Sequence, residues 1–199
     1  MVSILKQLNA EMDSVVGRAG SSLVQVRNRR GGAGAGTIWH PDGLVITNAH
    51  VVQGDYPQVA LRSGESLPAR LLAHDAKRDI AALMVNAREL PTIDLGESLK
   101  VKPGQWVMAM GHPWGVKGAA TAGVVIGLES EAHGLPHAGR EWLAVNMQLR
   151  PGHSGGPLMD VEGRLIGINT IMNGPDVGMA VPVHVVKRFL KDKLGSDSI

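Results

Sequence analysis

The sequence predicts an all-β protein, with two sets of about six short strands followed by a C-terminal helix. Its 26 glycines are spread through 199 residues, as is typical of a chain with many tight turns between short strands. Short apolar runs cut by turn residues recur in both halves, and only the end of the chain has a clear helical apolar stripe. This pattern fits a pair of packed barrels or a large β-sandwich.

The first half begins with an expected helix over residues 4–16, where apolar residues recur at helical spacing. Strands follow. They are predicted at 22–28, in 36–52 on both sides of a Pro41-Asp42-Gly43 turn, in 56–75 around a Ser-Gly-Glu turn, and at 79–85. The glycine-rich run 31–37 has no Lys after it and leads into a strand, so it is not a phosphate-binding loop. We expect it to be a flexible connection to a strand that starts at Thr37.

The second half again consists of short apolar runs separated by turn residues, and it ends in an expected helix. A crossing between the halves is expected at 90–104, and a helix is expected from Pro182 onward. The strand 157–170 is predicted to be a hairpin that turns at Glu162-Gly163. The strands predicted in this half are 105–111, 119–130, 141–148, 157–170 and 177–183.

Composition excludes several classes of protein. The net charge of +2 favours no nucleic-acid partner, and the absence of Cys excludes disulfides and thiol chemistry. No run approaches 18 apolar residues, so membrane insertion is not expected, and the N-terminus does not resemble a signal peptide. We therefore expect a cytoplasmic protein if the chain is complete, or a cell-envelope or periplasmic one if it is trimmed.

Three residues stand out as candidates for nucleophilic catalysis. Ser154 lies in PGHSGGPLM, a stretch of glycines and prolines that could be an ordinary turn. A serine hydroxyl needs a base beside it to act as a nucleophile, and His50 in VITNAHVV is a candidate. Asp79 begins a buried apolar run, where a carboxylate must be hydrogen-bonded. Each has an ordinary structural reading alone, but each lies at the edge of an apolar strand.

The motifs TNAHVV, DIAAL and GHSGGPL, in that order, resemble the chymotrypsin-fold serine peptidases, and most of all their HtrA-type branch. GHPWG, TAGVVIGL, GRLIGINT and VGMAVPV match further stretches of that branch. The resemblance implies two perpendicular six-stranded antiparallel β-barrels, at 22–95 and 96–183. An N-terminal segment (1–21) and a C-terminal helix and tail (184–199) would complete a single protease domain over 1–199.

The resemblance also implies a function and its residues. The chain would be a serine endopeptidase acting on unfolded or extended polypeptides, without a cofactor or metal. His50, Asp79 and Ser154 would be the catalytic triad, and the backbone N–H groups of Gly152 and Ser154 the oxyanion hole. Gly155 and Gly156 would let the backbone pass close beneath the nucleophile, where a Cβ would clash.

Substrate is expected to add as a strand beside residues 168–171. None of the residues expected to line the specificity pocket is acidic, so a small or medium aliphatic P1 residue is favoured over Arg or Lys. The lining residues are Gln148, Leu149, Ile168, Asn169, Thr170, Met179 and Ala180.

The sequence departs from the family in four places. The residue before the nucleophile is commonly Asn in this branch, but here it is His153, which we expect to point to the surface. Pro151 has no N–H and would stiffen the loop, presetting the oxyanion hole or locking it in an unproductive form. A PDZ domain usually follows in this branch, whereas this sequence stops after the helix, so we expect a stand-alone protease domain or a trimmed form. Residues 1–30 contain no aromatic residue, which argues against the family's N-terminally built trimer.

Two alternative functions have weaker support in the sequence. A pseudo-protease, which binds extended peptides without cutting them, usually lacks a triad residue, and all three are present here. A metal pair at His133 and His137 has helical spacing, but Gly134 and Pro136 between them oppose a helix.

Overall fold

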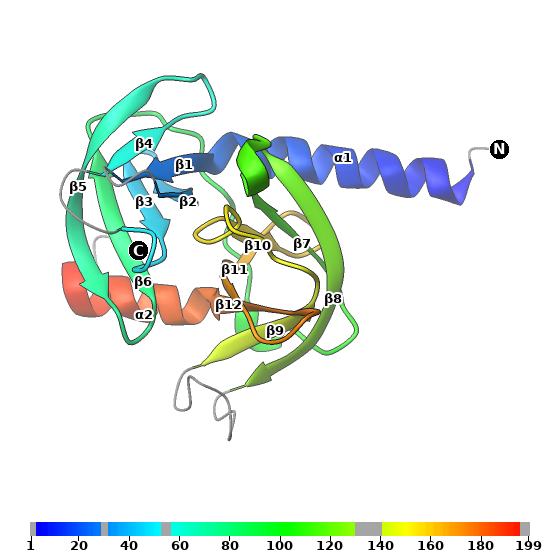
Figure 1. The fold of residues 1–199 in the computed structure, drawn as a ribbon. Coiled ribbons are helices and arrows are strands. Elements are labelled where there is room, and N and C mark those ends of the chain that lie inside the picture. The colour runs from blue at the N-terminus through cyan, green and yellow to red at the C-terminus, as the bar shows by residue number, and fades with distance from the viewer. Residues whose placement is uncertain (1–2, 29–31, 53–56, 130–140, 196–199) are drawn as a thin grey trace.

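The structure is a computed structural model that describes residues 3–28, 32–52, 57–129 and 141–195. In this part of the chain, twelve strands form two closed barrels of six strands each, and all of their pairings are antiparallel (Figure 1). Two α-helices accompany them, one at each end of the chain. The fold class predicted from the sequence is therefore confirmed.

The first barrel has the strand order β1-β2-β3-β6-β5-β4 and the second β10-β11-β12-β9-β8-β7. Closure gives every strand two neighbours, so no strand of either barrel is unpaired along a whole side. The strands of the first barrel are β1 (Leu23–Arg27), β2 (Ala33–His40), β3 (Leu44–Thr47), β4 (Gln58–Ala60), β5 (Ser66–Asp75) and β6 (Ile80–Val85). Those of the second are β7 (Trp106–Gly111), β8 (Ala119–Glu129), β9 (Trp142–Asn146), β10 (Pro157–Met159), β11 (Leu165–Met172) and β12 (Val177–Pro182).

Apolar residues are buried inside each barrel and also between the barrels. Strand β3 shows both environments: Val45 belongs to the core of the first barrel, whereas Leu44 and Ile46 belong to the cluster shared with the second barrel. Successive side chains of a strand point to opposite faces, so a strand buried on both faces must be apolar throughout. This is why the sequence shows short continuous apolar runs here instead of alternation.

Helix α2 (Val183–Leu194) contacts strands of both barrels, β5 and β6 in the first and β11 and β12 in the second (Figure 1). Its apolar stripe, with Val186, Phe189 and Leu190 fully buried, joins the cluster between the barrels. The helix begins after Pro182, as predicted, and Gly195 follows its last residue with a φ of 88°. Through α2, the end of the chain stabilises the contact between the two barrels.

Helix α1 (Ile4–Ser22) is longer than the predicted 4–16. Its C-terminal half packs on the shared cluster through Val15 and Ala19, and this tertiary contact outweighs the helix-weakening effect of two glycines in the same turns. Its N-terminal half extends from the body (Figure 1), and Ile4 and Leu5 are exposed. Within the residues that the structure describes, neither helix has the length and apolarity that a membrane span needs.

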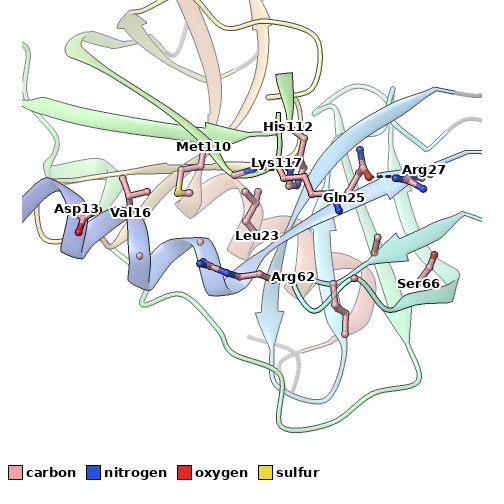
Figure 2. Close-up of a pocket in the computed structure, with 16 residues that line it drawn as sticks. Asp13, Val16, Leu23, Gln25, Arg27, Arg62, Ser66, Met110, His112 and Lys117 are labelled. Carbon is pink, nitrogen blue, oxygen red and sulfur yellow. Dashed lines mark hydrogen bonds between the residues drawn. The ribbon is translucent and has the colours of Figure 1, made fainter. Parts of the chain in front are cut away.

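A pocket of about 390 Å³ lies where α1 meets the first barrel and the β7–β8 connection (Figure 2). Arg27, Arg62 and Lys117 supply positive charge to its lining, and Asp13 supplies negative charge. The three candidate catalytic residues are not among those that line it.

The glycine-rich run does not form the flexible connection expected from the sequence. Strand β2 begins at Ala33, so four residues before Thr37 already pair with β1, with Val24 opposite Gly36 and Val26 opposite Gly34. A Cβ built on Gly36 would lie 2.8 Å from Val45, so this strand must pass close to its neighbours. Glycine here permits a close approach in the barrel, which a pattern of residue types does not distinguish from flexibility.

Candidate active site

The three candidate catalytic residues come from both barrels. His50 follows β3 and Asp79 immediately precedes β6, while Ser154 lies in the segment before β10. That segment is bound directly to the first barrel. The N–H of Ala35 in β2 donates to the Ser154 carbonyl at 2.8 Å, and Thr37 Oγ1 donates to the Gly155 carbonyl at 3.2 Å. The structure thus joins the serine loop to the barrel that carries His50 and Asp79.

His50 and Asp79 form a close pair. The imidazole Nδ1 lies 2.9 Å from one carboxylate oxygen of Asp79 and 3.0 Å from the other. The backbone N–H of His50 donates to the same carboxylate at 3.1 Å. A carboxylate on Nδ1 selects the tautomer with its proton there, which leaves Nε2 as the basic nitrogen. The histidine is therefore oriented and set in the tautomer that a general base requires.

Asp79 is held by residues of both barrels. Its side chain accepts a hydrogen bond from the Thr170 hydroxyl, and the Asn48 side-chain amide donates to its carbonyl at 3.0 Å. The backbone φ of Asp79 is 56°, a left-handed conformation that costs energy outside glycine and is concentrated at functional sites. Burial raises the pKa of Asp79, but the hydrogen bonds from His50 and Thr170 outweigh it, and the pKa lies below its usual value. The carboxylate is thus kept ionised.

Ser154 is half-buried and immediately precedes Gly155 and Gly156, where the backbone packs closely against its neighbours. Its hydroxyl donates to the Thr170 carbonyl at 2.7 Å, and among the described residues it has no hydrogen bond to His50. A base and nucleophile commonly become well aligned only in the complex with substrate. Thr170 therefore contacts the triad twice, at Asp79 through its hydroxyl and at Ser154 through its carbonyl.

The glycines after the serine are required by space. An ideal Cβ on Gly155 would lie 2.0 Å from the Ala35 carbonyl oxygen, and one on Gly156 would lie 2.1 Å from that of Met110. Gly155 also has a φ of 88°. The predicted need for glycine beneath the nucleophile is confirmed.

The expected oxyanion donors have no partner within the described part of the chain. Neither the N–H of Gly152 nor that of Ser154 donates to a protein acceptor there, whereas the N–H groups of His153, Gly155 and Gly156 all do. Gly152 has a φ of 105°, and a Cβ on it would lie 2.5 Å from the His112 carbonyl oxygen. Two neighbouring N–H groups without an acceptor are what an anion-binding site offers.

His153 does not point to the surface, contrary to the expectation from the sequence. Only 4% of it is exposed, and its Nδ1 lies 3.0 Å from the backbone nitrogen of Arg150. The end of β7 passes beside it, so closely that a Cβ on Gly111 would lie 2.6 Å from the His153 Cα. Burial lowers the pKa of His153, which makes the neutral imidazole the main form at neutral pH.

The residues expected to bind substrate fall into two groups. Gln148 is exposed and Thr170 touches the triad, whereas Leu149, Ile168, Met179 and Ala180 are buried in the apolar clusters. The Asn169 side chain is also buried and donates to the carbonyls of Met110 and Pro157. The side chains of this second group support the barrel, so contact with substrate from 168–169 would have to use the backbone.

Two supporting roles were missed in the sequence. Asn48 was not singled out, although a polar residue two positions before His50 at the end of a buried strand is a usable signal. Thr170 was expected only as a pocket wall, and no sequence pattern indicates that its hydroxyl reaches Asp79 from the other barrel. In the described residues, no three His, Cys, Asp or Glu side chains gather as metal ligands. His133 and His137 lie outside the described residues.

Comparisons with known proteins agree with this geometry. The trypsin-like peptidase domain family matches residues 34–168. The mitochondrial serine protease HTRA2 of Bos taurus is 37% identical over 79% of this chain and 35% of its own length. A DegP-like protein of Halomonas elongata, named as a probable periplasmic serine endoprotease, is 38% identical over 82% of this chain and 35% of its own.

The fold gives the same result. The solved HtrA-type protease AlgW with a tripeptide superposes with a TM-score of 0.82 and 29% identity, covering 92% of this chain and 64% of that one. This chain spans little more than a third of the length of the two relatives named above. The chain belongs to the trypsin-like peptidase family and has the protease domain of its HtrA-type branch.

Proposed function

We propose that this chain is a serine endopeptidase domain that cleaves peptide bonds in unfolded or extended polypeptides. The observation that carries the proposal is the His50–Asp79 pair, with Nδ1 2.9 Å from the carboxylate, in a barrel to which the Ser154 loop is hydrogen-bonded. Such a pair supplies an oriented base to a serine presented on an adjacent loop. Membership of the trypsin-like peptidase family supports the same reaction.

Catalysis would begin when the Ser154 hydroxyl leaves the Thr170 carbonyl and turns to His50. His50 Nε2 takes the proton as Ser154 Oγ attacks the scissile carbonyl carbon, forming a tetrahedral intermediate. His50 then gives the proton to the leaving amine, and the acyl-enzyme remains on Ser154. Water, deprotonated by His50, hydrolyses the acyl-enzyme in the same way. Asp79 stays ionised throughout and stabilises the imidazolium.

The charge of the tetrahedral intermediate would be stabilised by the N–H groups of Gly152 and Ser154. Both lack a protein acceptor in the described part of the chain, so they need not break a hydrogen bond to serve the oxyanion. Donors of this kind act mainly in the transition state, and loss of one costs about 10²–10³ in kcat.

An extended substrate fits the edge of β11 beside the nucleophile. The pairing of β11 with β10 ends at Ile168 opposite Pro157, so the backbone beyond Asn169 has no β10 partner. A peptide strand could add there through main-chain hydrogen bonds, which an unfolded chain can supply and a folded one cannot. Gln148 is exposed, and its side-chain amide donates to the exposed Asp176 at 2.8 Å. None of the residues predicted to line the specificity pocket is itself acidic, so we propose a small or medium aliphatic P1 residue.

The test is hydrolysis of unfolded casein by the parent chain and by Ser154→Ala, with folding of both checked by circular dichroism. Cleavage by the parent alone is the expected result, and a fluorophosphonate probe should label the parent and not the variant. A folded parent that neither cuts casein nor takes the probe would overturn the proposal and leave a peptide-binding module without activity.

A further inference from the structure

The residues Arg150 to His153 form a turn that carries the expected oxyanion donor. The His153 N–H donates to the Arg150 carbonyl at 2.9 Å, which closes the turn. Pro151 stands at its second position and Gly152, with φ of 105°, at its third, the combination that a type II turn favours. In such a turn the central peptide, between Pro151 and Gly152, decides where the Gly152 N–H points.

The side chain of His153 closes the same turn a second time. The backbone N–H of Arg150 is 3.0 Å from Nδ1, and the Arg150 carbonyl oxygen is 3.2 Å from it. That carbonyl already accepts from the His153 N–H. The nitrogen of Arg150 has no other acceptor in the described part of the chain, so the neutral imidazole with its proton on Nε2 satisfies the Arg150 N–H through Nδ1.

A proton on Nδ1 would change this arrangement. It would set an N–H against the Arg150 N–H at 3.0 Å, two donors facing each other, and leave the Arg150 nitrogen without an acceptor. The new Nδ1–H could turn to the Arg150 carbonyl, which already accepts from the backbone N–H that closes the turn. Protonation therefore removes the hydrogen bond from the Arg150 N–H to the imidazole, one of the two that close the turn.

We propose that His153 is a positioning residue, which in its neutral form holds the oxyanion turn in place and on protonation releases it. The proposal rests on the proposed peptidase function, because it deepens the role of the same loop. The other ionisable groups that face His153 are Arg150 in its own loop and His112 in the β7–β8 connection. His112 also contacts the turn, since its backbone N–H donates to the Gly152 carbonyl at 2.8 Å.

The kinetic test compares the parent chain with His153→Asn and His153→Leu, two variants of similar size. Asn offers an amide oxygen near the place of Nδ1 at every pH, while Leu offers no acceptor. With a fluorogenic peptide built on a casein site that the parent cuts, we expect Asn to retain most activity at pH 8. We expect Leu to lose roughly ten- to a hundredfold in kcat with little change in KM, because oxyanion donors act in the transition state.

The pH dependence separates positioning from packing. The protonation of His50 affects the parent and His153→Asn alike, so it cancels in the ratio of their kcat values. We expect the kcat of His153→Asn divided by that of the parent to be constant near pH 8 and to rise once the pH falls below the pKa of His153, by up to about tenfold for each further pH unit. The same rise should appear when both proteins also carry His112→Asn. A ratio that stays flat or falls, or a Leu variant as active as the Asn variant, would overturn the proposal.

A second readout does not depend on activity. In uniformly ¹⁵N-labelled Ser154→Ala, long-range ¹H–¹⁵N spectra report which ring nitrogen of His153 carries the proton, and the backbone amide signals are seen in the same sample. We expect an unprotonated Nδ1 at neutral pH, and a shift of the Arg150 and Gly152 amide signals as His153 titrates. A proton on Nδ1 at neutral pH would refute the inference even if the parent cuts casein. An inactive parent with the expected tautomer and shifts would instead refute the peptidase function and leave the turn as described.

Discussion

The hydroxyl of Thr170, on β11 of the second barrel, donates to the carboxylate of Asp79, immediately before β6 in the first. This hydrogen bond crosses between the barrels at the point where the catalytic residues meet. Because the Thr170 carbonyl also accepts from Ser154, one residue ties the acid and the nucleophile of the triad to the same backbone position.

Thr170→Val should show how much of this contact's effect comes from the hydrogen bond and how much from side-chain packing. Valine has the same size but no donor, so the pKa of Asp79 should rise and the carboxylate should hold His50 less firmly. We expect kcat to fall by roughly tenfold or more and the free energy of unfolding at pH 7 to fall by about 1–3 kcal/mol. Thr170→Ser keeps the hydroxyl and is the matched control. Equal kcat values for the Val and Ser variants would contradict a role for the hydroxyl.

Gly155→Ala should be poorly tolerated for two reasons, a φ of 88° and a Cβ placed 2.0 Å from the Ala35 carbonyl oxygen. Gly64→Ala is the control, since Gly64 has a φ of 94° but no atom within 4 Å of an added Cβ. The control isolates the backbone strain, which costs on the order of 1 kcal/mol. In urea unfolding, Gly155→Ala should lose clearly more stability than Gly64→Ala, and it should also lose activity. Equal losses would show that the close approach to β2 is not needed.

Stability should fall as the pH is lowered from 7 to 5, partly because of His112. Burial lowers the pKa of His112 from its usual 6.5, so below pH 6.5 the unfolded chain binds a proton that the folded chain does not. The unfolded state is then stabilised relative to the folded state as the pH falls, so the free energy of unfolding decreases. Urea unfolding at pH 7, 6 and 5 should show a smaller loss for His112→Asn than for the parent. His74→Asn, at an exposed histidine of β5, is the matched control; a similar change in both variants would refute the assignment to His112.

Phe189→Ala should weaken the contact between the barrels. Phe189 is fully buried in the cluster that α2 shares with both barrels, and removal of its ring would leave a cavity there. Such substitutions cost about 3–5 kcal/mol. Lys191→Ala, on the exposed side of the same helix, should change stability by less than about 0.5 kcal/mol. Thermal unfolding measures both, and a Phe189→Ala variant as stable as Lys191→Ala would show that α2 does not anchor the barrels.

Much of the fold followed from local patterns in the sequence. Turn residues such as Pro41-Asp42-Gly43 and Glu162-Gly163 separate short apolar runs in the sequence. The structure has strands on both sides of each turn. The stripe ending in Phe189 and Leu190 predicted α2, because helical periodicity is a property of neighbouring residues. The extension of α1 to Ser22 was missed, since its last turns are helical through tertiary packing of Val15 and Ala19.

The sequence by itself determined the strands and the terminal helix, because they depend on residue types at short spacing. It also provided the candidates His50, Asp79 and Ser154, through the resemblance of the motifs around them to those of a peptidase family. Only the tertiary structure decided which side chains meet across the barrels. In the folded protein, Thr170 donates to Asp79 and His153 is buried beside Arg150. Residues 33–37 of the glycine-rich run are part of β2. Those outcomes depend on the distance between segments far apart in the chain, and that distance is fixed by barrel closure and by the core between the barrels.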